Sequence, residues 1–356
     1  MKHIFIYLSS LSILSIALSG EHLVHSGKTN HLDHTDHHSG HDGHQHQNIP
    51  IGVMGAHSHE KGKTMLSYRY MFMDMGPNYI GDEKAGLGQI LGAPNGDTTF
   101  PIIPTEMQTQ MQMLGIMHGL TDRITLSAML MYVDKSMQHT FIDGSTFRTH
   151  SSGIGDFKFG GLVKIFDEND QQLLFNFMTS APLGSVDNEG FVPPAGGSVR
   201  LPYPMQLGSG TWDLMPGLTW LAQRGDLSFG AQAMATIRTG ENDEGYTFGD
   251  DFMVTGWTAY QLTDSLSTSF RASYKIWDNI EGADPNLNPL VVPTARTDLR
   301  GGERIDLFGG VNYDFHQGLL RSTRLAVEAG GSVWQDLDGP QLGMDWSITT
   351  GLQKTF

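Results

Sequence analysis

The sequence predicts an all-β protein, a transmembrane antiparallel outer-membrane β-barrel of about 12 strands with a disordered N-terminal extension. Three observations indicate this fold class. From Thr64 onward, apolar residues alternate with polar or small ones along successive segments, which is the period of a strand with two different faces. The connections between these segments are alternately short and long. The chain also ends in an aromatic residue, Phe356, on an amphipathic segment.

The first residues have the features of a secretory signal. Lys2 provides a positive charge, Ile4 to Leu18 form an apolar stretch, and Ala17 and Ser19 are small residues before Gly20. The apolar stretch is shorter than the about 20 residues that a membrane-spanning helix needs. We therefore expect residues 1–19 to be a signal peptide that is removed on export.

Residues 20–63 are polar and rich in histidine, so they are expected to form a flexible periplasmic extension. Neutral imidazoles bind Zn²⁺ and Cu²⁺, and aspartates lie between the histidines. Their irregular spacing specifies no single tetrahedral site, so we expect loose binding of a transition metal, with no cofactor required; a pH response and an incidental linker are the alternatives. The candidate metal ligands are His22, His25, His31, His34, His37, His38, His41, His44, His46, His57 and His59.

The segment "RITLSAMLMYV" (123–133) illustrates the strand pattern that the rest of the chain repeats. Ile124, Leu126 and Leu130 fall on one face, and Thr125 and Ser127 fall on the other. The polar face carries small residues, Arg and Lys in strand after strand, which suits a polar lumen inside a lipid-facing wall. The predicted strands are 64–74, 106–120, 123–134, 153–166, 171–181, 207–222, 227–239, 250–262, 266–278, 304–314, 323–334 and 346–356, so the barrel domain is 64–356.

Short connections such as "TDR" (121–123) alternate with long ones such as 182–206 and 279–303. In outer-membrane barrels the short turns face the periplasm, which places both ends of the barrel on the periplasmic side. The last strand, "WSITTGLQKTF", has Trp346, Ile348 and Phe356 in phase. It resembles the C-terminal signal that the barrel assembly machinery reads, so this machinery and outer-membrane lipid are expected partners in a Gram-negative bacterium.

Three further segments resemble a known family: "GLTDRITLSAMLMYV" (119–133), "SSGIGDFKFGGLVKIF" (151–166) and "MQLGSGTWDLMPGLTW" (205–220). They are similar to the outer-membrane channels named for the meta-pathway of phenol degradation. "SAPLGS" (180–185) and "GENDEGYTFGDD" (240–251) extend the resemblance over most of residues 64–356. The resemblance implies a barrel that passes small molecules, hydrophobic ones among them, and it carries no set of catalytic residues.

The phase of the strands predicts which side chains line the solute pathway. The methionines are either an adaptable apolar lining or soft ligands for Cu(I). The charged residues either set ion selectivity or brace the barrel by pairing across it. The predicted lumenal residues are Arg69, Met71, Met73, Met75, Met129, Met131, Lys158, Arg238, Arg271, Lys275, Arg304, Asp306, Arg324 and Glu328.

Composition and motifs exclude several functions. The net charge of −16 argues against a nucleic-acid binder. There is no GxSxG or HExxH motif, and so no enzyme is expected. We predict an outer-membrane barrel that passes a small solute, binds Cu or Zn through its His-rich tract and takes part in metal handling. The alternatives are a channel for small hydrophobic or aromatic compounds with an incidental tract, and a non-conducting structural barrel; the oligomeric state is left open.

Overall fold

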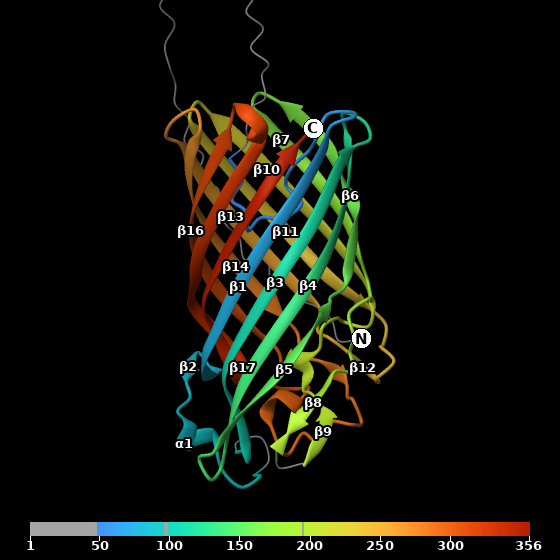
Figure 1. Cartoon of the computed structure of the whole chain (residues 1–356), viewed down its shortest axis with the longest axis vertical. Coiled ribbons are helices and arrows are strands. Elements are labelled where there is room, and N and C mark those ends of the chain that lie inside the picture. Colours follow the sequence, from blue (N-terminus) through green and yellow to red (C-terminus); the bar gives the residue numbers. More distant parts are fainter. Residues whose placement is uncertain (1–47, 96–98, 194–195) are drawn as a thin grey trace, which may run out of the picture. The chain divides into compact units, whose positions relative to one another are not determined.

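The computed structural model describes residues 48–95, 99–193 and 196–356. They form one antiparallel sheet that closes into a barrel (Figure 1). The wall consists of β1 (Thr64–Gly81), β3 (Ile102–Gly119), β4 (Ile124–Phe141), β6 (Phe157–Glu168), β7 (Gln171–Ala181), β10 (Trp212–Arg224), β11 (Leu227–Thr239), β13 (Asp251–Gln261), β14 (Leu266–Trp277), β16 (Gly302–Phe315) and β17 (Thr323–Thr355). Outside this path, β2 (Glu83–Lys84) pairs with β1, and β5 (Thr146–Ile154) pairs with β4.

The barrel closes through β17, which is unusually long. Its first half pairs with β16, up to Leu337, and its second half pairs with β1, up to Thr355. A side chain at Gly331 would collide with the backbone of Asp345, and the backbone of Met344 hydrogen-bonds to the side chain of Gln335 at 3.0 Å. The two halves therefore lie side by side as a hairpin, so that the eleven wall elements give twelve passes, the even number that antiparallel closure requires. The predicted fold class is confirmed.

Most predicted strands agree with the structure, and the differences have a clear cause. β7 and β11 have the predicted bounds, whereas β1 and β4 each continue seven residues further, to Gly81 and Phe141. The predicted strand at 153–166 is divided into β5 and β6 at Gly155 and Asp156. The Asp156 carboxylate accepts hydrogen bonds from the backbone N–H groups of Gly184 (3.0 Å) and Ser209 (2.8 Å). The Asp156 side chain therefore stabilises the long connections, and the pairing between strands is interrupted at this point.

The two faces of the wall differ as the alternation predicts. Leu126, Leu130 and Tyr132 of β4 are exposed, whereas Thr125 and Met129 on the same strand are buried. The exposed apolar side chains form the outer face, which suits lipid. Among the described residues, no helix has the length and apolar character needed to cross a membrane.

One end of the barrel has short turns, and the other carries the long connections (Figure 1). Asn169 and Asp170 form a two-residue turn between β6 and β7 with φ of 54° and 58°, the backbone that a type I′ hairpin requires. The long connections contain α1 (Leu87–Ile90), the pair β8 (Glu189–Val192) and β9 (Gly197–Arg200), and the pair β12 (Tyr246–Thr247) and β15 (Glu281–Gly282). Short 3-10 turns add η2 (Tyr203–Met205) and η3 (Pro293–Ala295) there, and η4 (Gly318–Leu320) precedes β17.

The structure corrects the prediction that residues 20–63 form a flexible extension up to the barrel. Residues 48–63, here called the inner segment, run inside the barrel at the short-turn end (Figure 1). Ile49, Ile51, Val53 and Ala56 are at most 2% exposed. Burial of these apolar side chains is favourable, and the sequence interpretation gave too little weight to them beside the histidines. Residues 1–47, with the predicted signal peptide, lie outside the described residues.

Candidate functional site

The inner segment is fixed to the wall around much of the circumference of the barrel. The Asn48 amide donates to Gln261 of β13 at 2.6 Å, and the Gln232 amide of β11 donates to the Met54 carbonyl at 2.9 Å. The backbone N–H of His59 donates to the Thr125 hydroxyl of β4 at 2.9 Å. Because these contacts reach three separate strands, the segment crosses the lumen instead of following one side of it.

Apolar packing reinforces these polar contacts. Ile49, Val53 and Ala56 belong to one buried cluster with wall residues that include Leu162, Leu174, Leu221 and Trp257. The wall partners come from β6, β7, β10 and β13. The inner segment thus provides apolar contacts for side chains that would otherwise line an open lumen.

Two buried ion pairs lie against the inner segment. Arg271 of β14 pairs with Glu328 of β17 across the intervening β16, and a side chain at Gly52 would collide with this pair. Arg324 pairs with Asp314 at 2.8 Å and also contacts the Asn48 side chain at 3.4 Å. Glycine at position 52 therefore allows the backbone to approach a charge pair closely.

A cavity of about 290 Å³ occupies the lumen towards the long-loop end. This volume is near the lower limit of small-molecule pockets, which span about 300–1,000 Å³. Its walls come from β1, β3, β4, β11, β13, β14, β16 and β17, with contributions from the loops around η2 and η3. The cavity and the inner segment thus occupy different parts of the lumen.

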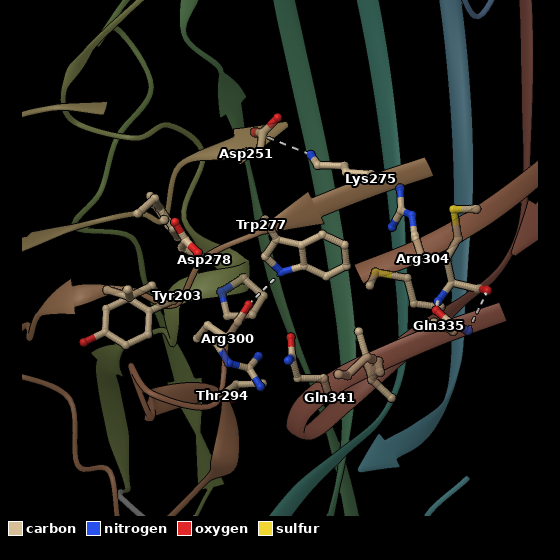
Figure 2. A pocket seen from close by; sticks show the side chains of 18 of the residues that line it. Tyr203, Asp251, Lys275, Trp277, Asp278, Thr294, Arg300, Arg304, Gln335 and Gln341 are labelled. Carbon is tan, nitrogen blue, oxygen red and sulfur yellow. Dashed lines mark hydrogen bonds and ion pairs between the residues drawn. The ribbon is translucent and has the colours of Figure 1, made fainter. Parts of the chain in front are cut away.

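One side of the cavity is charged. Its cations are Arg238, Lys275, Arg300 and Arg304, and its carboxylates are Asp251 and Asp278. Lys275 lies 3.5 Å from Asp251, and Figure 2 shows the two side chains facing each other. Arg304 pairs with Asp306 at 3.0 Å.

Arg238 and Arg300 complete the charged side in different ways. Arg238 contacts Asp213 closely and lies 4.0 Å from Asp251. Arg300 forms no ion pair with any residue that the structure describes; its guanidinium donates to the Pro340 carbonyl at 3.2 Å, and its Nε has no partner. Asp251 is therefore shared by two cations, whereas the Asp298 carboxylate acts on Arg300 without forming an ion pair with it.

The rest of the cavity lining is largely apolar and aromatic, and it intermingles with the charged residues. Met75, Met107, Met137 and Met344 contribute thioethers, and Trp277 contributes its indole. The Arg304 guanidinium lies 5.7 Å and the Lys275 ammonium 6.0 Å from the centre of the Trp277 ring, within or near the range of cation–π attraction. Figure 2 shows Lys275, Arg304, Arg300 and Gln341 around this ring. The cavity therefore joins a cationic surface to a flat apolar one.

The predicted lumenal residues separate into groups. Met75, Arg238, Lys275 and Arg304 line the cavity, and Arg271, Arg324 and Glu328 lie at the inner segment. Asp306 supports Arg304 from a buried position. The remaining predicted side chains are buried or half-buried on the wall: Arg69, Met71, Met73, Met129, Met131 and Lys158. On the outer face, Trp346 and Phe356 are exposed and Ile348 is half-buried.

Several residues of the site were missed by sequence reasoning. Trp277 was not among the predicted lumenal residues, although it alternates in phase with Arg271 and Lys275, which were, so its inward phase was a usable signal. Arg300 lies in a long connection, where no periodicity reports its direction. The apolar residues in "NIPIGVMGAH" (48–57) were a signal for the inner segment, since a flexible linker has no need of them.

The histidine prediction is only partly addressed. His57 and His59 lie in the inner segment, and burial lowers the pKa of both, with the positive charges of Arg324 and Arg69 adding to the effect at His57. Such surroundings disfavour a metal cation, and the described residues contain no cluster of three His, Asp or Glu side chains suited to one. His22, His25, His31, His34, His37, His38, His41, His44 and His46 lie outside the described residues.

Together, the closed antiparallel barrel, its apolar outer face and its partly filled polar lumen define an outer-membrane barrel of the channel type. The family described as "Putative MetA-pathway of phenol degradation" matches residues 95–287, which is more than half of the chain. The protein belongs to this family, as its sequence segments indicated. No curated protein matches the chain.

Solved structures agree on the fold. An outer membrane channel from Pseudomonas putida F1 has a TM-score of 0.58 at 14% identity, covering 86% of this chain and 100% of that one. A FadL homologue from Pseudomonas aeruginosa has a TM-score of 0.42 at 13% identity, covering 83% and 90%. The toluene transporter TodX of P. putida has a TM-score of 0.40 at 10% identity, covering 83% and 90%. The first of these supports the barrel fold of outer-membrane channels, and the other two are too distant to add to it.

Proposed function

We propose that this protein is an outer-membrane channel for a small solute, with the inner segment as a removable plug and the short-turn end facing the periplasm. The observation that carries the proposal is the division of the lumen. A solute-sized cavity lies near the long loops, and a separate chain segment crosses the lumen at the other end. A purely structural barrel has no need of a polar cavity with unpaired charge, since buried charges without partners are costly.

The contacts of the inner segment suit a plug that can leave. They combine hydrogen bonds with the burial of Ile49, Val53 and Ala56 against the wall, and the inner segment adds no strand to the sheet. Each hydrogen bond contributes about 1 kcal/mol and each large buried apolar side chain about 1.5–3 kcal/mol, so displacement opposes this packing but leaves the strand pairing of the wall intact. The barrel itself closes through β1 and β17 independently of the inner segment.

A comparison of two deletions tests this function. Removal of residues 20–63 is expected to raise single-channel conductance in planar bilayers, because it removes the inner segment together with the His-rich tract. Removal of residues 20–47 alone is the matched control and should leave the conductance of the full chain unchanged. Folding of each form is checked by heat-dependent mobility on electrophoresis, and absence of current from both folded forms contradicts the channel.

We further propose that the tract at 22–46 binds Cu²⁺ or Zn²⁺ in the periplasm beside the plug, and links the channel to metal handling. Nine histidines in this stretch support this, because neutral imidazole is a ligand for both ions. Calorimetric titration of the full chain with each metal at pH 7 should give heat that is lost in the form lacking residues 20–47. Equal heat from both forms would place any binding elsewhere.

A further inference from the structure

The electrostatics of the cavity define a narrower class of solute than its size alone. Four cations and two carboxylates line it, although the whole chain has a net charge of −16. Asp213 and Asp306, which lie behind this lining, pair with Arg238 and Arg304. The positive charge open to a ligand is therefore local and centres on Arg300, which has no ion pair among the described residues, and such a site favours an anion.

Arg300 and Arg304 are the cations best placed to meet a ligand. Arg304 holds Asp306 only through its Nε, while Arg300 has no ion pair among the described residues and an unpartnered Nε. Burial lowers the pKa of Arg300 to about 9, so it is still charged at neutral pH. The Asp298 carboxylate acts on Arg300 without forming an ion pair with it, because it pairs with Arg296. A buried guanidinium with no ion pair of its own is stabilised by an acceptor that forms charge-assisted hydrogen bonds.

The carboxylates at the cavity do not provide that acceptor. Asp251 is already shared between Lys275 and Arg238. Burial, followed by repulsion from Asp250 and Glu281, raises the pKa of Asp278, and Asp278 forms no ion pair with Arg300. Of the four cations, Arg300 is therefore the one without an ion pair among the described residues.

The apolar side of the cavity determines the rest of the ligand. The Trp277 indole lies beside Arg304 and Lys275, and the thioethers of Met107 and Met137 belong to a buried apolar cluster against which Met75 packs. An aromatic ring fits this combination, because it can stack on the indole and contact polarisable sulfur. An inorganic anion would leave this surface without a partner.

We propose that the cavity binds a small aromatic carboxylate, with its carboxylate at Arg300 and Arg304 and its ring between Trp277 and the methionines. This inference rests on the proposed channel function and names the substrate class of that site. Burial of the aromatic ring contributes binding free energy, and the two guanidiniums orient the ligand through its carboxylate.

Three probes of similar size test the proposal on the full-length protein in detergent, by calorimetry and by quenching of tryptophan fluorescence. Benzoate has the ring and the charge, benzyl alcohol has the ring alone, and hexanoate has the charge on an aliphatic chain. We expect saturable binding of benzoate, with benzyl alcohol and hexanoate each bound about tenfold more weakly. Equal binding of benzyl alcohol overturns the role of the cations, equal binding of hexanoate overturns the role of the ring, and no binding of benzoate overturns the proposal.

Variants locate the binding. Arg300→Gln and Arg304→Gln should each weaken benzoate binding about tenfold, as loss of a charge-assisted contact implies, and Arg304→Lys should restore part of it. Arg148→Gln is the matched control, because Arg148 is an exposed arginine outside the cavity. Since Arg304→Gln leaves Asp306 without its partner and could misfold, Trp277→Leu provides a second test through loss of preference for the ring over hexanoate. Unchanged benzoate binding in folded Arg300→Gln and Arg304→Gln contradicts the assignment.

The outcome for this site is separable from that for the channel. If the form lacking residues 20–63 conducts current but the full chain does not bind benzoate, the channel proposal stands and the proposed substrate class is wrong. If the full chain binds benzoate but no folded form conducts current, the channel proposal is wrong and the cavity is a binding site only.

Discussion

At the scale of single residues, the lumen combines predictable and unpredictable charges. The inward direction of Arg271 and Glu328 can be predicted from strand phase, because every second residue of a wall strand points inward. Their pairing does not follow, since it joins β14 and β17 across another strand and depends on register. Arg300 was not predictable at all, because it lies in a connection without a repeating pattern.

The Arg271–Glu328 pair gives a residue-scale prediction. Both side chains are under 10% exposed, so Glu328→Gln leaves a buried guanidinium without a counter-ion. We expect it to lower the free energy of unfolding by about 3 kcal/mol, measured by urea titration of the barrel in lipid vesicles. The double variant Arg271→Met with Glu328→Leu is the control, because it removes both charges and should be much closer to wild type. A larger loss from the double variant than from the single one contradicts this explanation.

At the scale of elements, the sequence predicted strands correctly where lipid-facing and lumen-facing residues alternate. It failed for a segment that is surrounded by the lumen alone. β7 and β11 had their predicted bounds because lipid and lumen impose opposite polarity on successive residues. The inner segment is surrounded by the lumen on all sides. Its apolar residues therefore do not alternate with polar ones, and no strand-like pattern marked the segment in the sequence. β17 was read as two strands, 323–334 and 346–356, and the structure joins them as one continuous hairpin.

The outer face gives an element-scale prediction. Val311 of β16 is 48% exposed and lies opposite Val327 of β17, which is 39% exposed. Val311→Arg places a charge on the lipid-facing side of both elements and should destabilise the folded barrel by about 2–4 kcal/mol if the position is near the bilayer midplane. Val311→Leu should have little effect in the same vesicle unfolding assay. A neutral result for the arginine variant would mean that this position lies at the membrane interface.

At the scale of the whole molecule, charge is distributed unevenly. The chain has an excess of acidic residues, whereas Arg69, Lys158 and Arg300 point to the interior without an ion pair among the described residues. The lumen is therefore more positive than the rest of the protein. Sequence composition alone concealed this, because net charge does not tell inner from outer residues.

This distribution predicts ion selectivity. With residues 20–63 removed, the channel should prefer anions, because unpaired inward cations attract them. A reversal potential measured in a KCl gradient checks the sign. Lys158→Gln combined with Arg69→Gln should shift it towards zero, while the exposed Arg148→Gln should not. A cation-selective current would show that the acidic loops, not the lumen, control permeation.

The closing contact of the barrel has a consequence for the order of folding. The backbone N–H of Phe356 donates to the Thr64 carbonyl at 2.8 Å, and that of Thr64 donates to Phe356 at 3.3 Å. Phe356 thus pairs with the first residue of the wall, a contact of very high sequence separation that forms slowly because a long loop must close. The inner segment is attached directly to that first strand, so it is synthesised early but enclosed late. Its final position is therefore reached either as the seam closes around it or by entry through the short-turn mouth afterwards, and the same mouth is its route out.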